Sequence, residues 1–420
     1  MKIDAVIEKY ISREEQRRYL FLSFPAWIIV SYGVLLGTFT TKDVLADFGN
    51  SSTISQAFLK SSVFIGMLVG AFLSGFISDT LGRKVSINLY LSFSVIFTFL
   101  GGFSSSTLSY TIFRTLAGFG FGGLMPSVNA YLSEVTSVRL RGRYLVLLES
   151  MWAIGSILVG VVHITLGKLS WRWDYWMMAL GSLLFIWYLR IPESPRFVFM
   201  KNGKEALEKL LGVTIKEKIE PIKKAKVPVY ELLKKPYTSR TLMIWSVWFV
   251  LSIVYYGIFL WLPSIFAAKG LVEKSMTLTF LMMVFQLPGY LLAAYLIEKI
   301  GRVKSMLLFL FGTALTSLGF ALVQSSALYI TFALLTSIFC LGAWGLVYAY
   351  TPELYPTSFR TTGNGSSGTI TRIGGIIAPY IVPIFKGKVL SLLLFFSVLL
   401  FLVGILVAVY GVETKESEIN

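Results

Sequence analysis

Long apolar stretches separated by short polar segments run through the whole chain of 420 residues. We count twelve such stretches, and each is long enough for a helix of about 20 residues, which crosses a hydrocarbon core of about 30 Å. Period-2 alternation in segments of about ten residues, typical of a membrane β-barrel, is absent. The pattern therefore predicts an all-α membrane protein with twelve transmembrane helices. They are centred near residues 30, 66, 94, 120, 154, 182, 250, 285, 313, 338, 374 and 400.

A set of polar residues recurs later in the chain at one fixed offset of 219 positions. The recurring pairs are Asp79 and Glu298, Gly82 and Gly301, Arg83 and Arg302, Tyr131 and Tyr350, Glu134 and Glu353, and Arg141 and Arg360. Internal repeats of this kind are typical of transporters whose two halves enclose the substrate at their seam. The repeat predicts two parallel, pseudo-symmetric six-helix bundles.

The composition changes between the two halves, where lysine, glutamate and proline replace the apolar runs. We interpret residues 191–237 as a cytoplasmic linker. The predicted N-terminal bundle then spans residues 1–190 and the predicted C-terminal bundle residues 238–420.

The net charge of +16 is concentrated on one side of the predicted membrane. Most lysines and arginines fall in the N-terminal tail, the even-numbered loops, the linker and the C-terminus, while Lys60, Arg114 and Arg372 lie within helices. By the positive-inside rule, both termini of this multi-pass protein of the cell membrane are expected to be cytoplasmic. We expect the basic residues to contact membrane lipids, and we expect no nucleic-acid partner.

The chain lacks the residues that several classes of activity require. The chain has one cysteine, Cys340, and one histidine, His163, so we expect no disulfide, no metal site and no catalytic cluster. The glycine-rich segment from Gly118 to Gly122 is not followed by Gly-Lys-Ser/Thr, and ATP-driven transport is not expected. His163 either caps a helix end or relays protons. The sequence thus predicts a protein that is not an enzyme and needs no cofactor.

The repeated residues lie where predicted helices end. Asp79 can accept from the backbone amides that begin the next helix, Gly82 permits the tight reversal, and Arg83 stays at the lipid headgroups. Glu134 and Arg141 share one face if their helix continues. We interpret the set as a gate that holds the cytoplasmic side closed; the alternative is that its charges only solvate helix ends. The gate comprises Asp79, Gly82, Arg83, Glu134, Arg141, Glu298, Gly301, Arg302, Glu353 and Arg360.

Five motifs occur in this chain in a fixed order. They are Asp79-x-x-Gly82-Arg83-Lys84, Arg114-x-x-x-Gly118-x-Gly120-x-Gly122, Glu134…Arg141-Gly142, Pro192-Glu193-Ser194-Pro195-Arg196 and Pro352-Glu353-Leu354-Tyr355-Pro356…Arg360. Together they resemble the major facilitator superfamily, specifically its sugar-porter-related branch. The resemblance covers nearly the whole chain and implies a secondary transporter that works by alternating access.

Finer features narrow this resemblance. Glu149 stands where sugar porters usually carry a glutamine, and the stretch from Arg141 to Trp152 resembles prokaryotic niacin and aromatic-acid carriers and the synaptic-vesicle-protein-like group. The segment from Arg372 to Pro379 resembles organic anion transporters. The resemblance implies a carrier for small organic anions. Many proton-coupled relatives carry an aspartate at the position of Ser31-Tyr32-Gly33. This chain therefore lacks the carboxylate that those relatives use for proton coupling.

Three ionisable residues stand out within the predicted helices, where a charge costs at least about 2.5–3.5 kcal/mol and normally faces a cavity or a partner. Arg372 offers a planar fork that suits a carboxylate; the alternative is a structural pair with Glu149. Glu149 is the best remaining carboxylate for a proton, with that same ion pair as its alternative. Arg114 either tunes the proton site or bonds to carbonyls of helix 1.

Aromatic and amide side chains complete the predicted substrate site. Tyr255 and Tyr256 lie on a helix that lines the cavity in this superfamily, and phenol groups both stack on an aromatic acid and hydrogen-bond to it. Trp152, one turn from Glu149, and Gln286 are further candidates.

The features together predict a monomeric secondary transporter that moves a small organic anion, with an aromatic or nicotinate-like carboxylate as the favoured example, by proton coupling. The rival interpretation within transport is a porter for a sugar or another neutral metabolite. The rival from another class is a non-transporting sensor or scaffold with this fold. Substrate, protons and membrane lipids are the expected partners.

Overall fold

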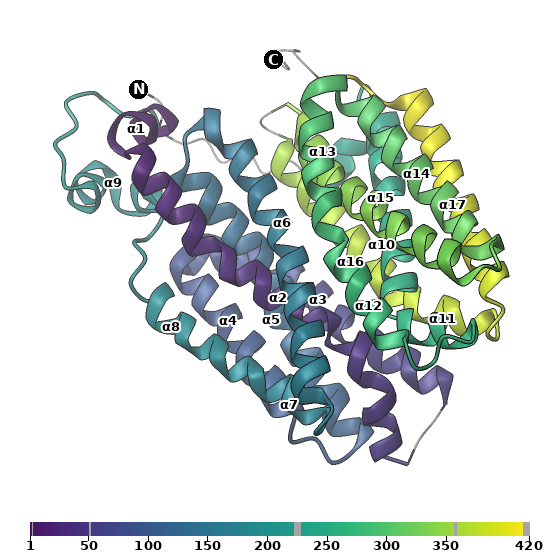
Figure 1. Cartoon of the computed structure of the whole chain (residues 1–420). Coiled ribbons are helices and arrows are strands. Elements are labelled where there is room, and N and C mark those ends of the chain that lie inside the picture. Colours follow the sequence, from purple (N-terminus) through teal and green to yellow (C-terminus); the bar gives the residue numbers. More distant parts are fainter. Residues whose placement is uncertain (2, 50–51, 222–227, 357–358, 415–420) are drawn as a thin grey trace. The chain divides into compact units, whose positions relative to one another are not determined.

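The computed structural model describes residues 1, 3–49, 52–221, 228–356 and 359–414. Residues 222–227 of the predicted linker and 415–420 of the predicted C-terminal bundle lie outside this part. The described chain is helical almost throughout (Figure 1). Its helices are α1 (Ile3–Tyr10), α2 (Arg13–Asp47), α3 (Thr53–Leu81), α4 (Arg83–Gly101), α5 (Thr107–Val135), α6 (Val138–Val162), η1 (His163–Gly167), α7 (Arg172–Trp176), η2 (Met177–Ser182), α8 (Leu183–Tyr188), α9 (Pro195–Leu211), η3 (Val229–Leu233), α10 (Thr238–Phe259), α11 (Leu262–Ala268), α12 (Ser275–Val284), α13 (Gln286–Ile300), α14 (Arg302–Leu322), α15 (Ser326–Glu353), α16 (Arg360–Ile384) and α17 (Val389–Tyr410).

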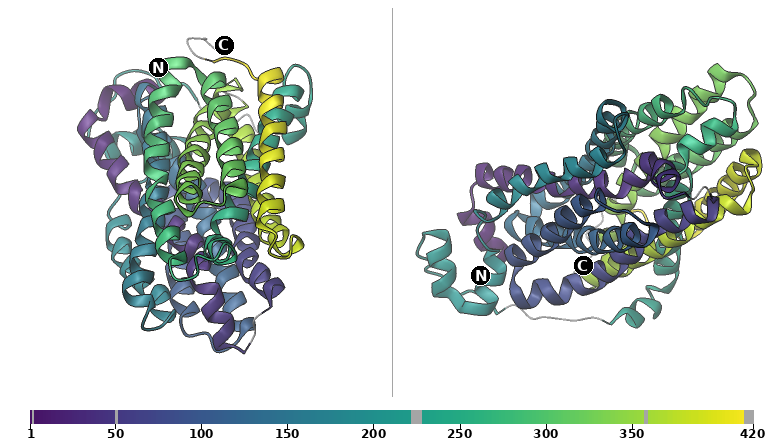
Figure 2. Two further views of the ribbon diagram at one scale, coloured as in Figure 1. Left: turned by 45° about the vertical axis from the view of Figure 1, so that its right-hand side comes forward. Right: turned by 90° about the horizontal axis from the view of Figure 1, so that it is seen from below.

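Two compact units make up the chain, and each is described by itself. The first consists of Met1–Val34, Ile65–Gly155 and Tyr175–Ala225, and the second of Leu35–Phe64, Ser156–Asp174 and Lys226–Asn420. In the first unit α4 packs along α5. In the second, α14 packs against α15 and α17, and α10 packs against α16 (Figure 1 and Figure 2). The domain boundaries after residues 190 and 237 stay predictions.

Nine helices of the described chain are long and apolar enough to cross a membrane. The three other predicted spans correspond to α5, to the region of α7, η2 and α8, and to α16. α5 has 29 residues and α16 has 25, but both are rich in glycine and hydroxyl side chains, which lower the mean hydropathy. Around residue 182 the chain is divided among α7, a 3₁₀ segment and α8, so no single piece there reaches the length of a span.

The small residues of α5 explain why this helix is less apolar than its neighbours. A Cβ placed on Gly122 would overlap the backbone of Met67 in α3, and one on Gly120 would overlap Ser94 and Tyr90 in α4. Small side chains let helix backbones approach closely in membranes. Gly120 and Gly122 therefore allow α5 to pack closely against α4 and α3.

The N-terminal segment forms a short amphipathic helix. The buried side chains of α1 are Ile3, Val6 and Ile7, and they pack with Leu207 of α9 and Ile215 in one apolar cluster. The sequence pattern predicted only a charged N-terminal tail here. Helix α1 therefore packs against α9 and the segment that follows it.

Candidate functional site

Arg83 and Glu134 form a buried ion pair in the first unit. The Nε and Nη2 atoms of Arg83 donate to the two carboxylate oxygens of Glu134, each at 2.8 Å. The Nη1 atom of Arg83 lies 3.2 Å from Asp79 and donates to the carbonyl of Ser78 at 2.9 Å. Bidentate pairs of this kind are among the strongest charge-assisted hydrogen bonds. Three predicted gate residues thus lie together at the junction of α3, α4 and α5.

The start of α4 is capped by Glu193 from the segment that precedes α9. Its carboxylate accepts from the backbone amides of Arg83 at 3.0 Å and Lys84 at 3.2 Å. Ser194 donates to Glu134 at 2.6 Å. We expected Asp79 to accept these amides. The structure instead gives the amides to Glu193, because a carboxylate at a helix N-terminus satisfies free N–H groups and interacts favourably with the helix dipole.

Gly82 is required by the turn that joins α3 to α4. Its φ is 101°, a conformation that other residues rarely adopt. A Cβ on Gly82 would also overlap the carboxylate of Glu193. The glycine therefore serves both the backbone reversal and the close approach of the capping acid.

The second unit repeats this arrangement. Arg302 donates to both oxygens of Glu353, at 2.9 and 3.1 Å, and lies 3.5 Å from Glu298. Gly301 has a φ of 92°. The amide of Arg302 donates to Glu413 at 2.9 Å.

Glu413 and Thr414 were missed by the sequence analysis. Glu413 caps the start of α14, and Thr414 donates to Glu353 at 2.5 Å. They take the places of Glu193 and Ser194 in the second unit. The available signal was the pair Glu-Thr near the end of the chain, which matches Glu-Ser at an offset of 220 rather than 219.

Arg141 and Arg360 have contacts different from those expected. α5 ends at Val135 and α6 begins at Val138, so Glu134 and Arg141 lie on different helices and share no face. Arg141 donates to Asp4 of α1 at 3.0 Å, and Arg360 donates to the carbonyl of Tyr355 at 3.0 Å.

Arg114 is buried in the first unit and bonds to the backbone of α2. Its side chain is 1% exposed, and it donates to the carbonyls of Gly33 at 2.7 Å and Val34 at 3.4 Å. This is the structural alternative considered for Arg114. Glu149 and Trp152 lie one turn apart on α6 and are buried, and the Trp152 carbonyl accepts from Ser31 at 2.6 Å.

The second unit gathers the other predicted substrate residues. Gln286 is fully buried; its Oε1 atom accepts from Ser156 at 3.0 Å, and its Nε2 atom lies 3.5 Å from the hydroxyl of Tyr255. The rings of Tyr255 and Tyr256 are 5.1 Å apart. Arg372 is 6% exposed and follows Thr371, whose carbonyl accepts from Ser252, three residues before Tyr255 on α10, at 2.6 Å. Tyr255, Tyr256, Gln286 and Arg372 thus form one polar and aromatic group, called here the arginine–tyrosine site.

Trp344 of α15 belongs to this site but was not predicted. Its ring centroid lies 5.9 Å from that of Tyr255 and 6.5 Å from that of Tyr256. Its indole N–H is buried and has no hydrogen-bond partner among the described residues. Nothing in the sequence distinguishes it, because aromatic residues make up 15% of the chain. An arginine, two phenols and a free indole N–H together can bind a carboxylate carried on a flat ring.

The family of the chain follows from comparison with known proteins. A family model described as "Sugar (and other) transporter" matches residues 7–420. The chain belongs to this family. One relative is the niacin transporter NiaP of Acinetobacter baylyi, which is 31% identical over 84% of this chain and 84% of the relative. Another is NiaP of Bacillus subtilis, which is 35% identical over 96% of this chain and 98% of the relative. Its name gives the niacin/nicotinamide assignment as provisional.

A solved structure gives the same fold. The xylose transporter XylE of E. coli, in a partially occluded inward open conformation, aligns with a TM-score of 0.78, covering 96% of this chain and 99% of that chain at 14% identity. Synaptic vesicle 2-related proteins are also among the relatives. The major facilitator fold and the resemblance to niacin carriers are therefore confirmed. The chain is a multi-pass membrane protein of a secondary transporter family and is not an enzyme.

Proposed function

We propose that this transporter carries a small organic anion, an aromatic or nicotinate-like monocarboxylate, by alternating access coupled to protons. The observation that carries the proposal is the arginine–tyrosine site. A guanidinium buried in a low-dielectric site binds a carboxylate bidentately, and the surrounding phenol and indole rings suit a flat heteroaromatic ring. Relatives named for niacin transport support the same class of substrate.

Proton coupling is assigned to Glu149. A carboxylate within a membrane helix can bind and release a proton, and a nearby change of charge alters its affinity for that proton. Glu149 therefore takes up a proton in one state of the cycle and releases it in another. Arg114 keeps a supporting part, because its bonds to Gly33 and Val34 fix the helix that many proton-coupled relatives use for coupling.

The two charge clusters are proposed as the cytoplasmic gate. Each one ties the ends of several helices of its own unit through an arginine, a glutamate from the next long helix and a capping glutamate. These bonds hold the helix ends together at the cytoplasmic side and so keep that side closed. The positive-inside distribution supports cytoplasmic termini. We further propose that the basic residues contact membrane lipids and that the transporter is a monomer.

The substrate class is tested by competition in proteoliposomes that contain the purified protein. Uptake of labelled nicotinate is measured against unlabelled nicotinate, benzoate, a dicarboxylate and glucose. We expect nicotinate and benzoate to compete and glucose to have no effect. Uptake of glucose with no uptake of any acid would instead support the neutral-sugar alternative, and a lack of flux for every compound would support the scaffold alternative.

A further inference from the structure

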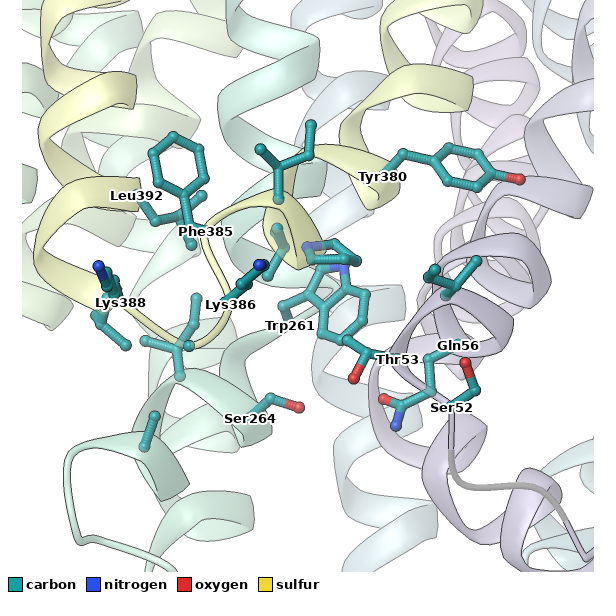
Figure 3. A pocket seen from close by; sticks show the side chains of 18 residues that line it. Ser52, Thr53, Gln56, Trp261, Ser264, Tyr380, Phe385, Lys386, Lys388 and Leu392 are labelled. Atoms are coloured by element: carbon teal, nitrogen blue, oxygen red, sulfur yellow. The ribbon is translucent and has the colours of Figure 1, made fainter.

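The second unit contains a cavity with an unbalanced positive charge. Its volume is about 940 Å³, and it is lined by the start of α3, by α11, and by the segment that joins α16 to α17 (Figure 3). Lys386 and Lys388 line it, together with polar groups such as Gln56. None of its described lining residues is an aspartate or glutamate. This lysine cavity therefore attracts anions.

Lys60 is a buried cation that no described carboxylate neutralises. It lies on α3 with 4% of its surface exposed, and no described acid lies within 4.0 Å of its Nζ atom. The Nζ atom donates to the carbonyl of Gly37 at 3.2 Å. An ammonium group has three donors, so this bond leaves two. Ionisable groups inside membrane helices normally pair or face a substrate path.

Trp261 touches both Lys60 and the lysine cavity. Its ring centroid lies 4.6 Å from the Nζ atom of Lys60, a cation–π contact that offsets part of the cost of burial. The same ring lines the cavity, where it lies between Lys386 and Thr53 (Figure 3). Its indole N–H is buried without a hydrogen-bond partner among the described residues. The cavity wall thus carries a free indole N–H on a ring that also contacts a cation with spare donors.

The helix that carries Lys60 also leads to the arginine–tyrosine site. Phe64 follows Lys60 by four residues, about 6 Å along α3, and its ring centroid is 4.4 Å from that of Tyr256. Between them, Ser61 donates to the carbonyl of Ile376 in α16 at 2.8 Å. Lys60 therefore lies on α3 between the residues that line the lysine cavity and the residue that contacts Tyr256.

We infer that Lys60 and Trp261 form a second carboxylate-binding position, which a monocarboxylate reaches through the lysine cavity before it reaches Arg372. Lys386 and Lys388 raise the local concentration of the anion, Trp261 moves its ring and donates its N–H, and the Lys60 ammonium binds the carboxylate. The inference rests on the proposed function, because a neutral substrate would make no use of a cation here. The alternative is that Lys60 only braces α2 through Gly37.

The test is binding of labelled nicotinate to the purified full-length protein. Lys60→Gln keeps a donor for the Gly37 carbonyl and removes the charge, whereas Lys60→Arg keeps the charge. We expect Lys60→Gln to raise the Kd for nicotinate about tenfold or more, which corresponds to the loss of one charge-assisted hydrogen bond, and Lys60→Arg to retain most of the affinity. Trp261→Phe, which keeps a ring but removes the N–H, is expected to weaken binding by a smaller factor.

Lys269 provides a matched control. It also donates to a backbone carbonyl, that of Ala321 at 3.2 Å, and lies 5.2 Å from the ring centroid of Tyr329, but it does not line the lysine cavity. Lys269→Gln should leave the Kd unchanged. Bracing is tested by the melting temperature without ligand. Lys60→Gln and Lys60→Met both lose the charge, but only Lys60→Met also loses the donor to Gly37, so bracing predicts a lower melting temperature for Lys60→Met than for Lys60→Gln.

The outcomes are distinguishable from those of the proposed function. If the wild type binds and transports nicotinate and Lys60→Gln does so with the same Kd, this inference is wrong and the proposed function stands. Unchanged affinity in Lys60→Gln, together with a lower melting temperature for Lys60→Met than for Lys60→Gln, would assign Lys60 to bracing. If the wild type neither binds nor transports any carboxylate, both the inference and the proposed function fall.

Discussion

Arg83 donates to both carboxylate oxygens of Glu134 at 2.8 Å, and this pair has a counterpart in the second unit. Arg302 and Glu353 make the same two bonds at 2.9 and 3.1 Å. The two copies differ in burial: the side chain of Glu134 is 10% exposed, whereas that of Glu353 is 31% exposed. The same chemistry should therefore be worth more in the first unit than in the second.

Glu134→Gln is expected to destabilise the protein more than Glu353→Gln. Breaking a buried pair leaves an uncompensated charge and costs about 3 kcal/mol or more, whereas solvent screens the more exposed pair. The melting temperatures of the two variants in the same detergent measure the difference. Equal losses, or a larger loss for Glu353→Gln, would show that burial does not set the strength of these pairs.

Gly82→Ala is expected to lower both stability and transport. The backbone strain at a φ of 101° costs about 1–2 kcal/mol, and the added Cβ displaces Glu193 from the start of α4. Gly142→Ala is the control, because a Cβ there meets no atom within 4 Å and alanine favours a helix. Normal melting temperature and uptake for Gly82→Ala would contradict the assigned role of the turn.

Val6→Asp is expected to detach α1 from α9. Val6 is fully buried in the apolar cluster, and an ionised carboxylate there would lack any compensating partner. Limited trypsin digestion should then cleave faster at Arg13, Arg17 and Arg18. Ala5→Asp places the same charge on the exposed side of α1 and should leave the cleavage rate as in the wild type. Equal rates for the two variants would mean that α1 does not dock through this cluster.

Glu149→Gln is expected to separate exchange from accumulation. If Glu149 carries the coupled proton, the variant should still exchange internal for external nicotinate but should not concentrate it in response to a proton gradient. With one proton per substrate, a gradient of one pH unit drives about tenfold accumulation of the wild-type substrate. A variant that still accumulates nicotinate tenfold would place the coupled proton on another group.

The sequence indicated the paired charges because residues of the same type recur at the same offset in both halves. Arg83 and Glu134 each stand at a helix end and each has a partner 219 residues later, so their contact could be anticipated. Arg141 could not be placed, since the extended residue Thr136 ends α5 and no proline or glycine marks that break. The capping role of Glu413 was hidden by the one-residue change of offset and by the absence of the flanking prolines found around Glu193.

The candidate substrate site was predicted in part for a similar reason. Arg372 is a rare kind of residue for the middle of an apolar segment and was marked by that rarity, whereas Tyr255 was predicted because the resemblance implies a cavity-lining helix there. Trp344 is an ordinary residue for a membrane helix, and only the position of its N–H in three dimensions distinguishes it. Lys60 was noticed as an intramembrane cation, but its contact with Trp261 depends on α11, which is only seven residues long and carries no motif.

The most direct test of the proposed function is nicotinate uptake driven by an inward proton gradient in proteoliposomes, compared between the wild type, Arg372→Lys and Arg372→Ala. If Arg372 binds the carboxylate, the wild type accumulates nicotinate, Arg372→Ala loses uptake at least about tenfold, and Arg372→Lys retains an intermediate rate, because lysine keeps the charge but not the planar fork. Uptake by Arg372→Ala at the wild-type rate, in protein with an unchanged melting temperature, would contradict the assignment of the carboxylate to α16.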